Sequence, residues 1–231
     1  MLGLNFDNID KQTSRKIAKL KDDPYLNKKY NRDLRIQQKM KYFNNHFINI
    51  DKGLNKKKVI DIGPAFGEFL EVCKFHNFGN VLGIDAKSGD CMGNPYYELS
   101  EIMCKVQNIP VEYCGLLWWI HNNKLKNDSV CIINSQGSIE QAFTKYINGD
   151  NHRGGQSVLK WIMNDELKYE FIKFIEECKR LLCSKGVLMI YGNGTSNVSK
   201  YNNLIVNLIE DIGGMKIKYT DCKRLHRIVK L

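Results

Sequence analysis

The sequence has no long hydrophobic run, few prolines and no basic segment leading into an apolar one at its start. Its longest wholly apolar stretches, 116–120 and 187–191, are far shorter than the roughly 20 residues that a membrane-spanning helix needs. Residues 1–10 carry two aspartates and do not resemble a secretory signal. We therefore expect a cytoplasmic protein with no membrane span.

The sequence also lacks paired cysteines. Its eight cysteines are scattered, with no C-x-x-C pair and no histidines at the spacing of zinc ligands. Cys131 and Cys178 fall within apolar segments, where a thiol behaves as a small hydrophobic side chain. The pattern predicts reduced thiols in a core, with neither a metal site nor a disulfide.

The length of 231 residues fits one large α/β domain and is too short for two such domains and a linker. Four prolines, no repeat and no low-complexity linker interrupt the pattern. Residues 1–56 form a basic lead-in with apolar positions at helical spacing. We interpret them as a helical cap over a domain of residues 57–231.

The net charge of +10 is concentrated at the two ends of the chain. Residues 1–60 hold 15 Lys and Arg against 6 Asp, and residues 216–231 hold 6 against 1. A basic arm predicts a phosphate-bearing partner such as RNA, a nucleotide-linked substrate or an anionic surface. However, lysine outnumbers arginine about four to one, which coding bias explains as well as selection for phosphate binding. Nucleic-acid binding thus stays an open alternative.

From residue 57 onward, short apolar segments bounded by glycine alternate with amphipathic ones. Strands are expected at 59–62, 81–84, 111–114, 129–133, 187–191, 215–219 and 226–231, and helices at 66–76, 97–106, 166–182 and 198–212. This alternation predicts an α/β fold: a Rossmann-like, doubly wound, mostly parallel seven-stranded sheet with an N-terminal helical cap. In such folds a ligand binds beyond the carboxyl ends of the strands, near the point where the strand order reverses.

The most informative segment is residues 59–70, with the sequence VIDIGPAFGEFL. An apolar strand enters a turn of small residues and passes directly into a helix, so backbone can approach a ligand closely there. The nicotinamide fingerprint G-x-G-x-x-G is not met, because Ala65 and Glu68 take two of its positions after Gly63. Glu68 would also repel a pyrophosphate, whereas a cofactor with a sulfonium and an ammonium group tolerates nearby carboxylates.

This segment resembles motif I of the class I S-adenosylmethionine-dependent methyltransferases, in which an acidic residue and one further residue precede G-x-G-x-G. Asp61, Gly63, Ala65 and Gly67 occupy its positions, with alanine in place of the central glycine. Asp85 matches the acidic residue that ends the next strand in that family and binds both ribose hydroxyls of the cofactor. The resemblance implies a small-molecule methyltransferase that uses S-adenosyl-L-methionine and releases S-adenosyl-L-homocysteine. The cofactor-binding residues that it implies are Asp61, Gly63, Pro64, Ala65, Gly67, Asp85, Ala86, Gly115, Leu116, Asn134, Ser135 and Gln136.

Two later segments are also similar to that family. Residues 138–141 (SIEQ) resemble its V-L-E-H-like segment, and residues 174–190 resemble its signature F-x-x-E-x-x-R-x-L-x-x-x-G-x-L-x-I. The resemblance covers residues 57–231, with two departures. No acid follows the third strand near 114–116, and an insertion at about 142–165 predicts a lid specific to this protein.

The reaction that the resemblance implies is in-line attack of an acceptor oxygen or nitrogen on the sulfonium methyl, for which alignment and desolvation supply much of the catalysis. Glu140, His121 and His152 are the candidates for a general base. Each also has a structural interpretation, Glu140 at a helix start and the histidines at the surface. Trp118 and Trp119 follow the third strand, either as stacking partners of a ligand or as core aromatics.

The segment after the fourth strand narrows the choice of acceptor. Residues 134–137 contain neither proline nor tyrosine, unlike the D-P-P-Y turn of amino-methylating DNA enzymes, and no cysteine follows a proline as in cytosine-C5 enzymes. The resemblance to small-molecule methyltransferases and the asparagine- and lysine-rich composition lead us to expect a small polar or anionic acceptor, such as a sugar or a nucleotide-linked precursor of a surface polysaccharide. An RNA or DNA methyltransferase that uses its basic termini, and a non-catalytic cofactor-binding scaffold, are the alternatives. The sequence gives no indication of the oligomeric state.

Overall fold

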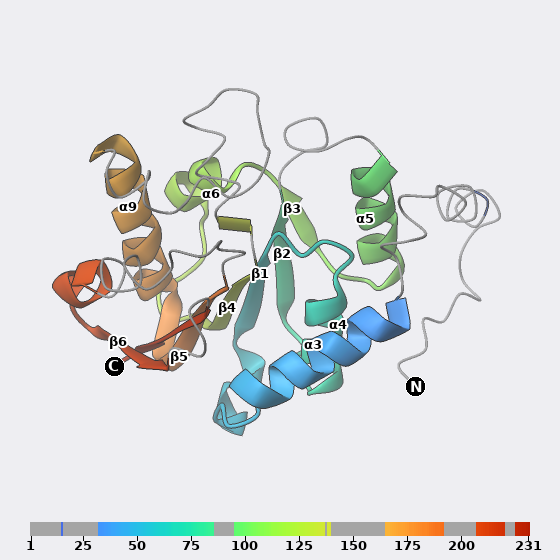
Figure 1. Cartoon of the computed structure of the whole chain (residues 1–231), viewed down its shortest axis with the longest axis horizontal. Coiled ribbons are helices and arrows are strands. Elements are labelled where there is room, and N and C mark those ends of the chain that lie inside the picture. The colour runs from blue at the N-terminus through green and yellow to red at the C-terminus, as the bar shows by residue number, and fades with distance from the viewer. Residues whose placement is uncertain are drawn as a thin grey trace.

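The computed structural model of the chain describes residues 15, 32–85, 95–136, 138–139, 165–191, 207–219 and 225–231. The strands are β1 (Lys58–Ile62), β2 (Val81–Asp85), β3 (Val111–Tyr113), β4 (Val130–Gln136), β5 (Leu182–Tyr191), β6 (Met215–Tyr219) and β7 (Leu225–Lys230). The helices named in Figure 1 are α3 (Arg32–His46), α4 (Glu68–Phe75), α5 (Pro95–Val106), α6 (Leu116–Asn122) and α9 (Asp165–Leu181), and a 3₁₀ helix, η2 (Lys52–Lys56), follows α3.

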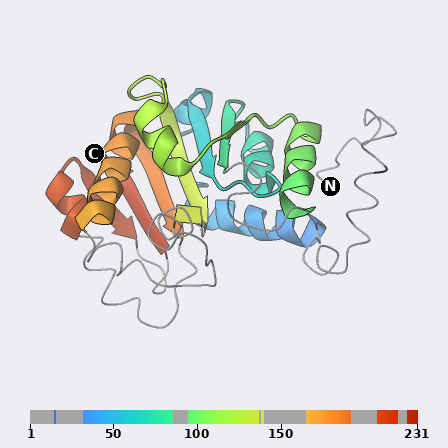
Figure 2. The same cartoon turned by 90° about the horizontal axis from the view of Figure 1, so that it is seen from above.

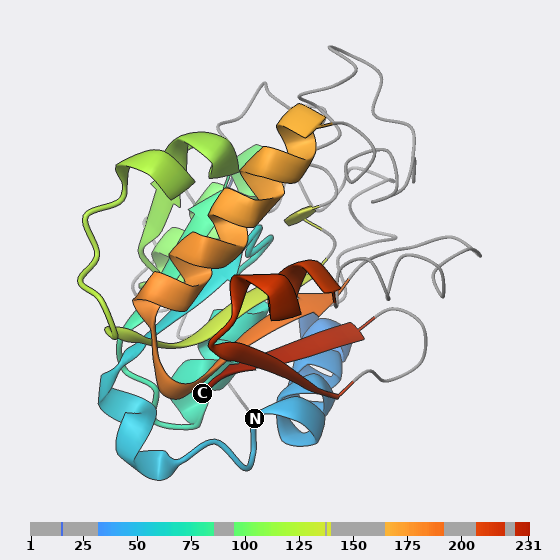
Figure 3. The same ribbon diagram turned by 90° about the vertical axis from the view of Figure 1, so that its left-hand side faces the viewer.

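The seven strands form one sheet in the order β3-β2-β1-β4-β5-β7-β6. β1 pairs in parallel with both β2 and β4, and β4 pairs in parallel with β5. β7 is antiparallel to both of its neighbours, β5 and β6. These strands form the edge of the sheet that is turned toward the viewer in Figure 3. The sheet is therefore mixed but mostly parallel, which confirms the predicted fold class. Its order reverses between β1 and β4, where folds of this kind bind their ligands.

Each face of the sheet has its own hydrophobic core, because alternate residues of a strand point to opposite faces. In β1, Ile60 packs into the core beneath α6 and α9, whereas Val59 packs into the core beneath α3 and α4. Figure 2 shows α6 and α9 on one side of the sheet and α3 on the other. The same alternation directs Asp61, two residues after Val59, toward the side of α3 and α4.

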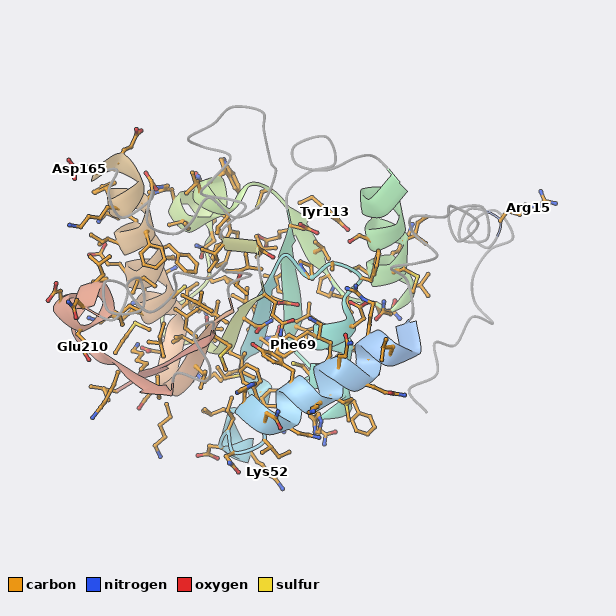
Figure 4. All side chains as sticks on the ribbon, in the orientation of Figure 1. Arg15, Lys52, Phe69, Tyr113, Asp165 and Glu210 are labelled. Atoms are coloured by element: carbon orange, nitrogen blue, oxygen red, sulfur yellow. The ribbon has the colours of Figure 1, made fainter. Side chains whose placement is uncertain are left out.

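The described part of the N-terminal segment is built into the core. Ile36 and Phe43 of α3, and Phe47 just after it, are buried in the same core as Val59, and the ring centroids of Phe47 and Phe69 lie 5.5 Å apart. Figure 4 shows Phe69 where α3 crosses the body of the protein. The helix expected in this region is confirmed for α3. The division of the chain at residue 56 stays a prediction.

Residues 116–120 form part of α6, a helix that the sequence pattern did not predict after the third strand. The two tryptophans separate because consecutive helical residues point about 100° apart. Trp119 is 0% exposed and lies in the core, and Trp118 is 59% exposed. The helix expected at 198–212 lies outside the described residues except for 207–212. No helix among the residues that the structure describes is long and apolar enough to cross a membrane.

Candidate functional site

The turn between β1 and α4 has three residues in the left-handed region of backbone space: Gly63 at φ +69°, Ala65 at +53° and Gly67 at +79°. Alanine in this region is strained by about 1 kcal/mol, so neighbouring contacts must hold the turn. They come from the α5 side: the Ser100 hydroxyl donates to the Ala65 carbonyl, and Gln107 Nε2 donates to the Phe66 carbonyl at 2.8 Å. The turn is therefore fixed before any ligand binds.

Gly63 also lets the segment after β4 approach this turn. A Cβ atom at Gly63 would lie 1.9 Å from Ser138 Oγ, far inside van der Waals contact. Both Ser138 and Ile139 lie just beyond the end of β4. The absence of a side chain at Gly63 therefore lets the segment after β4 lie against the turn after β1, at the point where the strand order reverses.

Asp61 is a buried acid of this site, with 4% of its surface exposed. It is the register partner of Asn134 on β4, and Asn134 Nδ2 donates to Asp61 Oδ1 at 2.7 Å. Burial raises the pKa of Asp61 from 3.8 to about 7, because the charged form loses its hydration. Lys39 and the Asn134 hydrogen bond oppose that rise in pKa. The carboxyl group therefore titrates near neutral pH.

Replacing Asp61 by asparagine is expected to stabilise the folded protein increasingly as the pH rises from about 4 to about 7. The folded state binds the Asp61 proton more tightly than the unfolded state, so the free energy of unfolding of the wild type falls across this window. Across this window the difference in free energy of unfolding between the variant and the wild type should grow by at most about 4 kcal/mol. The figure follows from a pKa that moves from 3.8 to about 7, at about 1.4 kcal/mol for each pH unit. Urea unfolding of both proteins at several pH values measures it. Parallel curves for the two proteins would contradict an Asp61 pKa raised by burial.

Glu68, the first residue of α4, is 1% exposed and forms an ion pair with Arg35 of α3. The Arg35 guanidinium also lies over the Phe66 ring, 5.0 Å from its centroid. The charge of Glu68 is thus balanced inside the protein. Glu68 therefore gives no reason to exclude a pyrophosphate.

α3 contributes two further contacts that the sequence did not reveal. Lys39 Nζ donates to Gln136 Oε1, and Tyr42 Oη donates to Asn134 Oδ1 at 2.9 Å. Together with Arg35, these residues lie at i, i+4 and i+7 and so share one face of the helix. The spacing is visible in the sequence, but it does not show what the helix packs against. Gln136 and Asn134, both predicted cofactor residues, are therefore tied to the N-terminal segment.

Asp85 ends β2, is partly exposed, and lies next to β1 in the sheet. Its carbonyl accepts a hydrogen bond from the Cys114 amide at 2.8 Å, and its register partner is Tyr113, labelled in Figure 4. Gly115, which caps α6, is exposed with no atom within 4 Å of where a Cβ would lie. The side chain of Leu116 is buried in the core, so a ligand at this position could contact its backbone but not its side chain.

Three predicted cofactor residues remain, and the structure describes two of them, Pro64 and Ser135. Pro64 lies within the glycine turn against Gly83, and Ser135 is buried at the end of β4 as the register partner of Ile62. Ala86 lies outside the described residues. The structure thus brings the described members of the predicted set to the carboxyl ends of β1, β2, β3 and β4.

Of the three candidate bases, His121 lies among the described residues, and the structure does not bring it together with the predicted cofactor residues. His121 Nε2 lies 3.0 Å from Glu170 Oε2, in a contact between α6 and α9. These helices cover the sheet face opposite to α3 and Asp61. Glu140 and His152 lie outside the described residues, as does most of the insertion at 142–165. Among residues 32–85 and the other described ranges, no three His, Cys, Asp or Glu side chains are grouped to hold a metal ion.

No protein-family model matches the sequence, and no curated protein matches it. Solved structures do match the fold. A candidate S-adenosyl-L-methionine-dependent methyltransferase from Methanococcus maripaludis has a TM-score of 0.53 at 16% identity, over 91% of this chain and 91% of that one. A SAM-dependent methyltransferase from Archaeoglobus fulgidus has a TM-score of 0.50 at 15% identity, over 85% and 76% of the two chains.

The chain also spans 58% of the length of a candidate sarcosine dimethylglycine methyltransferase from Galdieria sulphuraria, with 15% identity over 72% of this chain and a TM-score of 0.42. Identities this low define a shared fold and leave the reaction open. The chain has the class I, Rossmann-like fold of the S-adenosylmethionine-dependent methyltransferases.

Proposed function

We propose that this protein is an S-adenosyl-L-methionine-dependent methyltransferase that acts on an oxygen or nitrogen of a small polar or anionic acceptor. One observation carries the proposal. Asp61 and Asp85 stand at the ends of the neighbouring strands β1 and β2 and flank the fixed turn at residues 63–67. Asp61 and the closely approachable backbone of the turn lie where the strand order reverses, and Asp85 ends the strand next to β1.

The charges of this site fit a cationic cofactor better than a pyrophosphate. Asp61 is buried and its pKa is raised, so a cation beside it would stabilise the ionised carboxylate. Asp85, partly exposed at the end of β2, would accept hydrogen bonds from the ribose hydroxyls. A dinucleotide would place its phosphates at this turn, next to the Asp61 carboxylate. Gly115 and the backbone of Leu116 are proposed to border the adenine.

The cofactor supplies a methyl group on a positively charged sulfur, which needs no further activation. The residues of this chain would hold that group in line with the acceptor and exclude water. An acceptor that is already anionic requires no base, whereas a sugar hydroxyl would be helped by one. Glu140 and His152 stay candidates for that base. The contact of His121 with Glu170 does not support such a role for His121.

Calorimetric titration with S-adenosylmethionine, S-adenosylhomocysteine and NAD tests the cofactor. We expect the first two to bind and NAD to give no heat. Binding of NAD alone, or of none of the three, would contradict the proposal.

Methyl transfer to a panel of acceptors tests the reaction. The panel should include sugars, nucleotide-linked sugars, small carboxylates, RNA and DNA, with labelled S-adenosylmethionine as the donor. We expect product with a small acceptor. Transfer to RNA or DNA that weakens steeply with salt would favour the basic termini and the nucleic-acid alternative. Cofactor binding without transfer to any acceptor would favour the scaffold.

A further inference from the structure

We infer that Tyr42 is a positioning residue of the proposed cofactor site and that it acts through Asn134 to fix the Asp61 carboxylate. A test of this inference by cofactor binding rests on the proposed function. The hydrogen bonds lie within the protein, so a test by protein stability does not depend on that function.

The three side chains form a continuous chain of hydrogen bonds from α3 to β1. Tyr42 Oη donates to Asn134 Oδ1 at 2.9 Å, and Asn134 Nδ2 donates to Asp61 Oδ1 at 2.7 Å. Asn134 is 1% exposed and Asp61 is 4% exposed, so water does not readily replace either partner. Because Asn134 and Asp61 are register partners on adjacent parallel strands, the sheet itself sets the distance between their backbones.

The chemistry of the three groups fixes the direction of this chain. An ionised carboxylate only accepts hydrogen bonds, so Asn134 must present its NH₂ group to Asp61. The amide oxygen then faces Tyr42, whose hydroxyl must donate. Without that hydroxyl the amide loses the donor that holds its orientation. A rotated amide would present oxygen to Asp61, which disfavours the ionised form of the carboxylate.

Charged and titratable groups surround Asp61 on the elements packed against it: Lys39 from α3, Glu68 and Cys73 from α4, Asp85 from β2 and Cys104 from α5. Arg35 of α3 interacts in turn with Lys39 and Glu68. Burial raises the pKa of both thiols, so they stay neutral. Lys39 is the cation that favours the ionised Asp61 most directly. All of these groups remain in a Tyr42→Phe variant, which therefore isolates the hydroxyl.

Phenylalanine at this position preserves the packing of the ring. The ring centroid of Tyr42 lies 5.7 Å from that of Phe47 and 5.9 Å from that of Phe69. The matched control is Tyr169→Phe on α9, where the side chain is 55% exposed on the other side of the sheet. It removes the same hydroxyl group without touching the chain of hydrogen bonds.

The first test is calorimetric titration of wild type, Tyr42→Phe and Tyr169→Phe with S-adenosylhomocysteine from about pH 5 to about pH 9. In the wild type, affinity should rise with pH as Asp61 ionises near pH 7. In Tyr42→Phe the midpoint of that rise should move up by about half to one unit, with binding about 3- to 10-fold weaker below it and recovered at high pH. Tyr169→Phe should follow the wild type. An unmoved midpoint in Tyr42→Phe, with equal weakening at every pH, would overturn the inference.

The second test needs no cofactor and separates the inference from the proposed function. The free energy of unfolding of each protein is measured over the same pH range, with Asn134→Leu as a further variant. The free energy of unfolding falls with rising pH until Asp61 of the folded protein has ionised. In Tyr42→Phe and in Asn134→Leu this fall should continue to a higher pH than in the wild type. If the wild type does not bind S-adenosylhomocysteine and this shift is present, the proposed function fails and the hydrogen-bond chain stands. Identical pH profiles of stability would overturn the chain.

Discussion

Replacing Asp85 by alanine is expected to weaken the binding of S-adenosylhomocysteine by about 100-fold, or about 2.7 kcal/mol. The proposed role of Asp85 is to accept two hydrogen bonds from the ribose, and a hydrogen bond to a charged group contributes about 1.5–3 kcal/mol. Asp85 lies at the end of β2 and is partly exposed, so the fold should tolerate the loss of its carboxylate. Calorimetric titration measures the affinity, and thermal unfolding shows that the variant is folded.

Asp128→Ala is the matched control for this prediction. Asp128 precedes β4 at the opposite end of the strands, where its carboxylate is paired with Lys230 at 2.6 Å. It is an exposed carboxylate outside the proposed site, so its removal should leave the affinity unchanged. If Asp85→Ala and the wild type bind with equal affinity, Asp85 is not part of the cofactor site.

Replacing Gly63 by alanine is expected to destabilise the protein by about 3 kcal/mol and to abolish cofactor binding. The φ of +69° strains any side chain at this position, and the new Cβ would lie 1.9 Å from Ser138 Oγ and 2.5 Å from its Cβ. Either the turn or the segment after β4 must move. For a protein of this size, the melting temperature should fall by about 6–12 °C.

Gly79→Ala provides the comparison, because a Cβ at this position would have no atom within 4 Å and the φ of Gly79 is not in the left-handed region. This substitution should change the melting temperature by no more than a few degrees and leave binding intact. Thermal unfolding and titration of both variants test the pair. A Gly63→Ala protein as stable as Gly79→Ala would show that the turn is not constrained as the structure describes.

The turn at residues 63–67 could be predicted from sequence because its determinants are local. Glycine is the residue that adopts positive φ readily, and an apolar strand before it and an amphipathic helix after it fix the context. Asp61 and Asp85 follow from the same local pattern, since each ends or nearly ends a strand. The structure places them on neighbouring strands, β1 and β2.

The role of α3 could not be predicted in the same way. Its apolar residues indicated a helix, and the expected position was a cap over the domain. The contacts of Arg35 with Glu68 and of Tyr42 with Asn134 join residues 33 and 92 positions apart in the chain. No local pattern encodes such pairs, because they arise from the packing of one element on another.

The sequence by itself determined the alternation of strands and helices, the left-handed turn and the acids at the strand ends, since backbone preferences and hydrophobic periodicity act over a few residues. Only the tertiary structure decided that Asp61 lies opposite Asn134, that Glu68 is neutralised by Arg35, and that His121 pairs with Glu170 on the other side of the sheet. Burial and the approach of distant side chains set the charge of a site, and both exist only once the chain has folded.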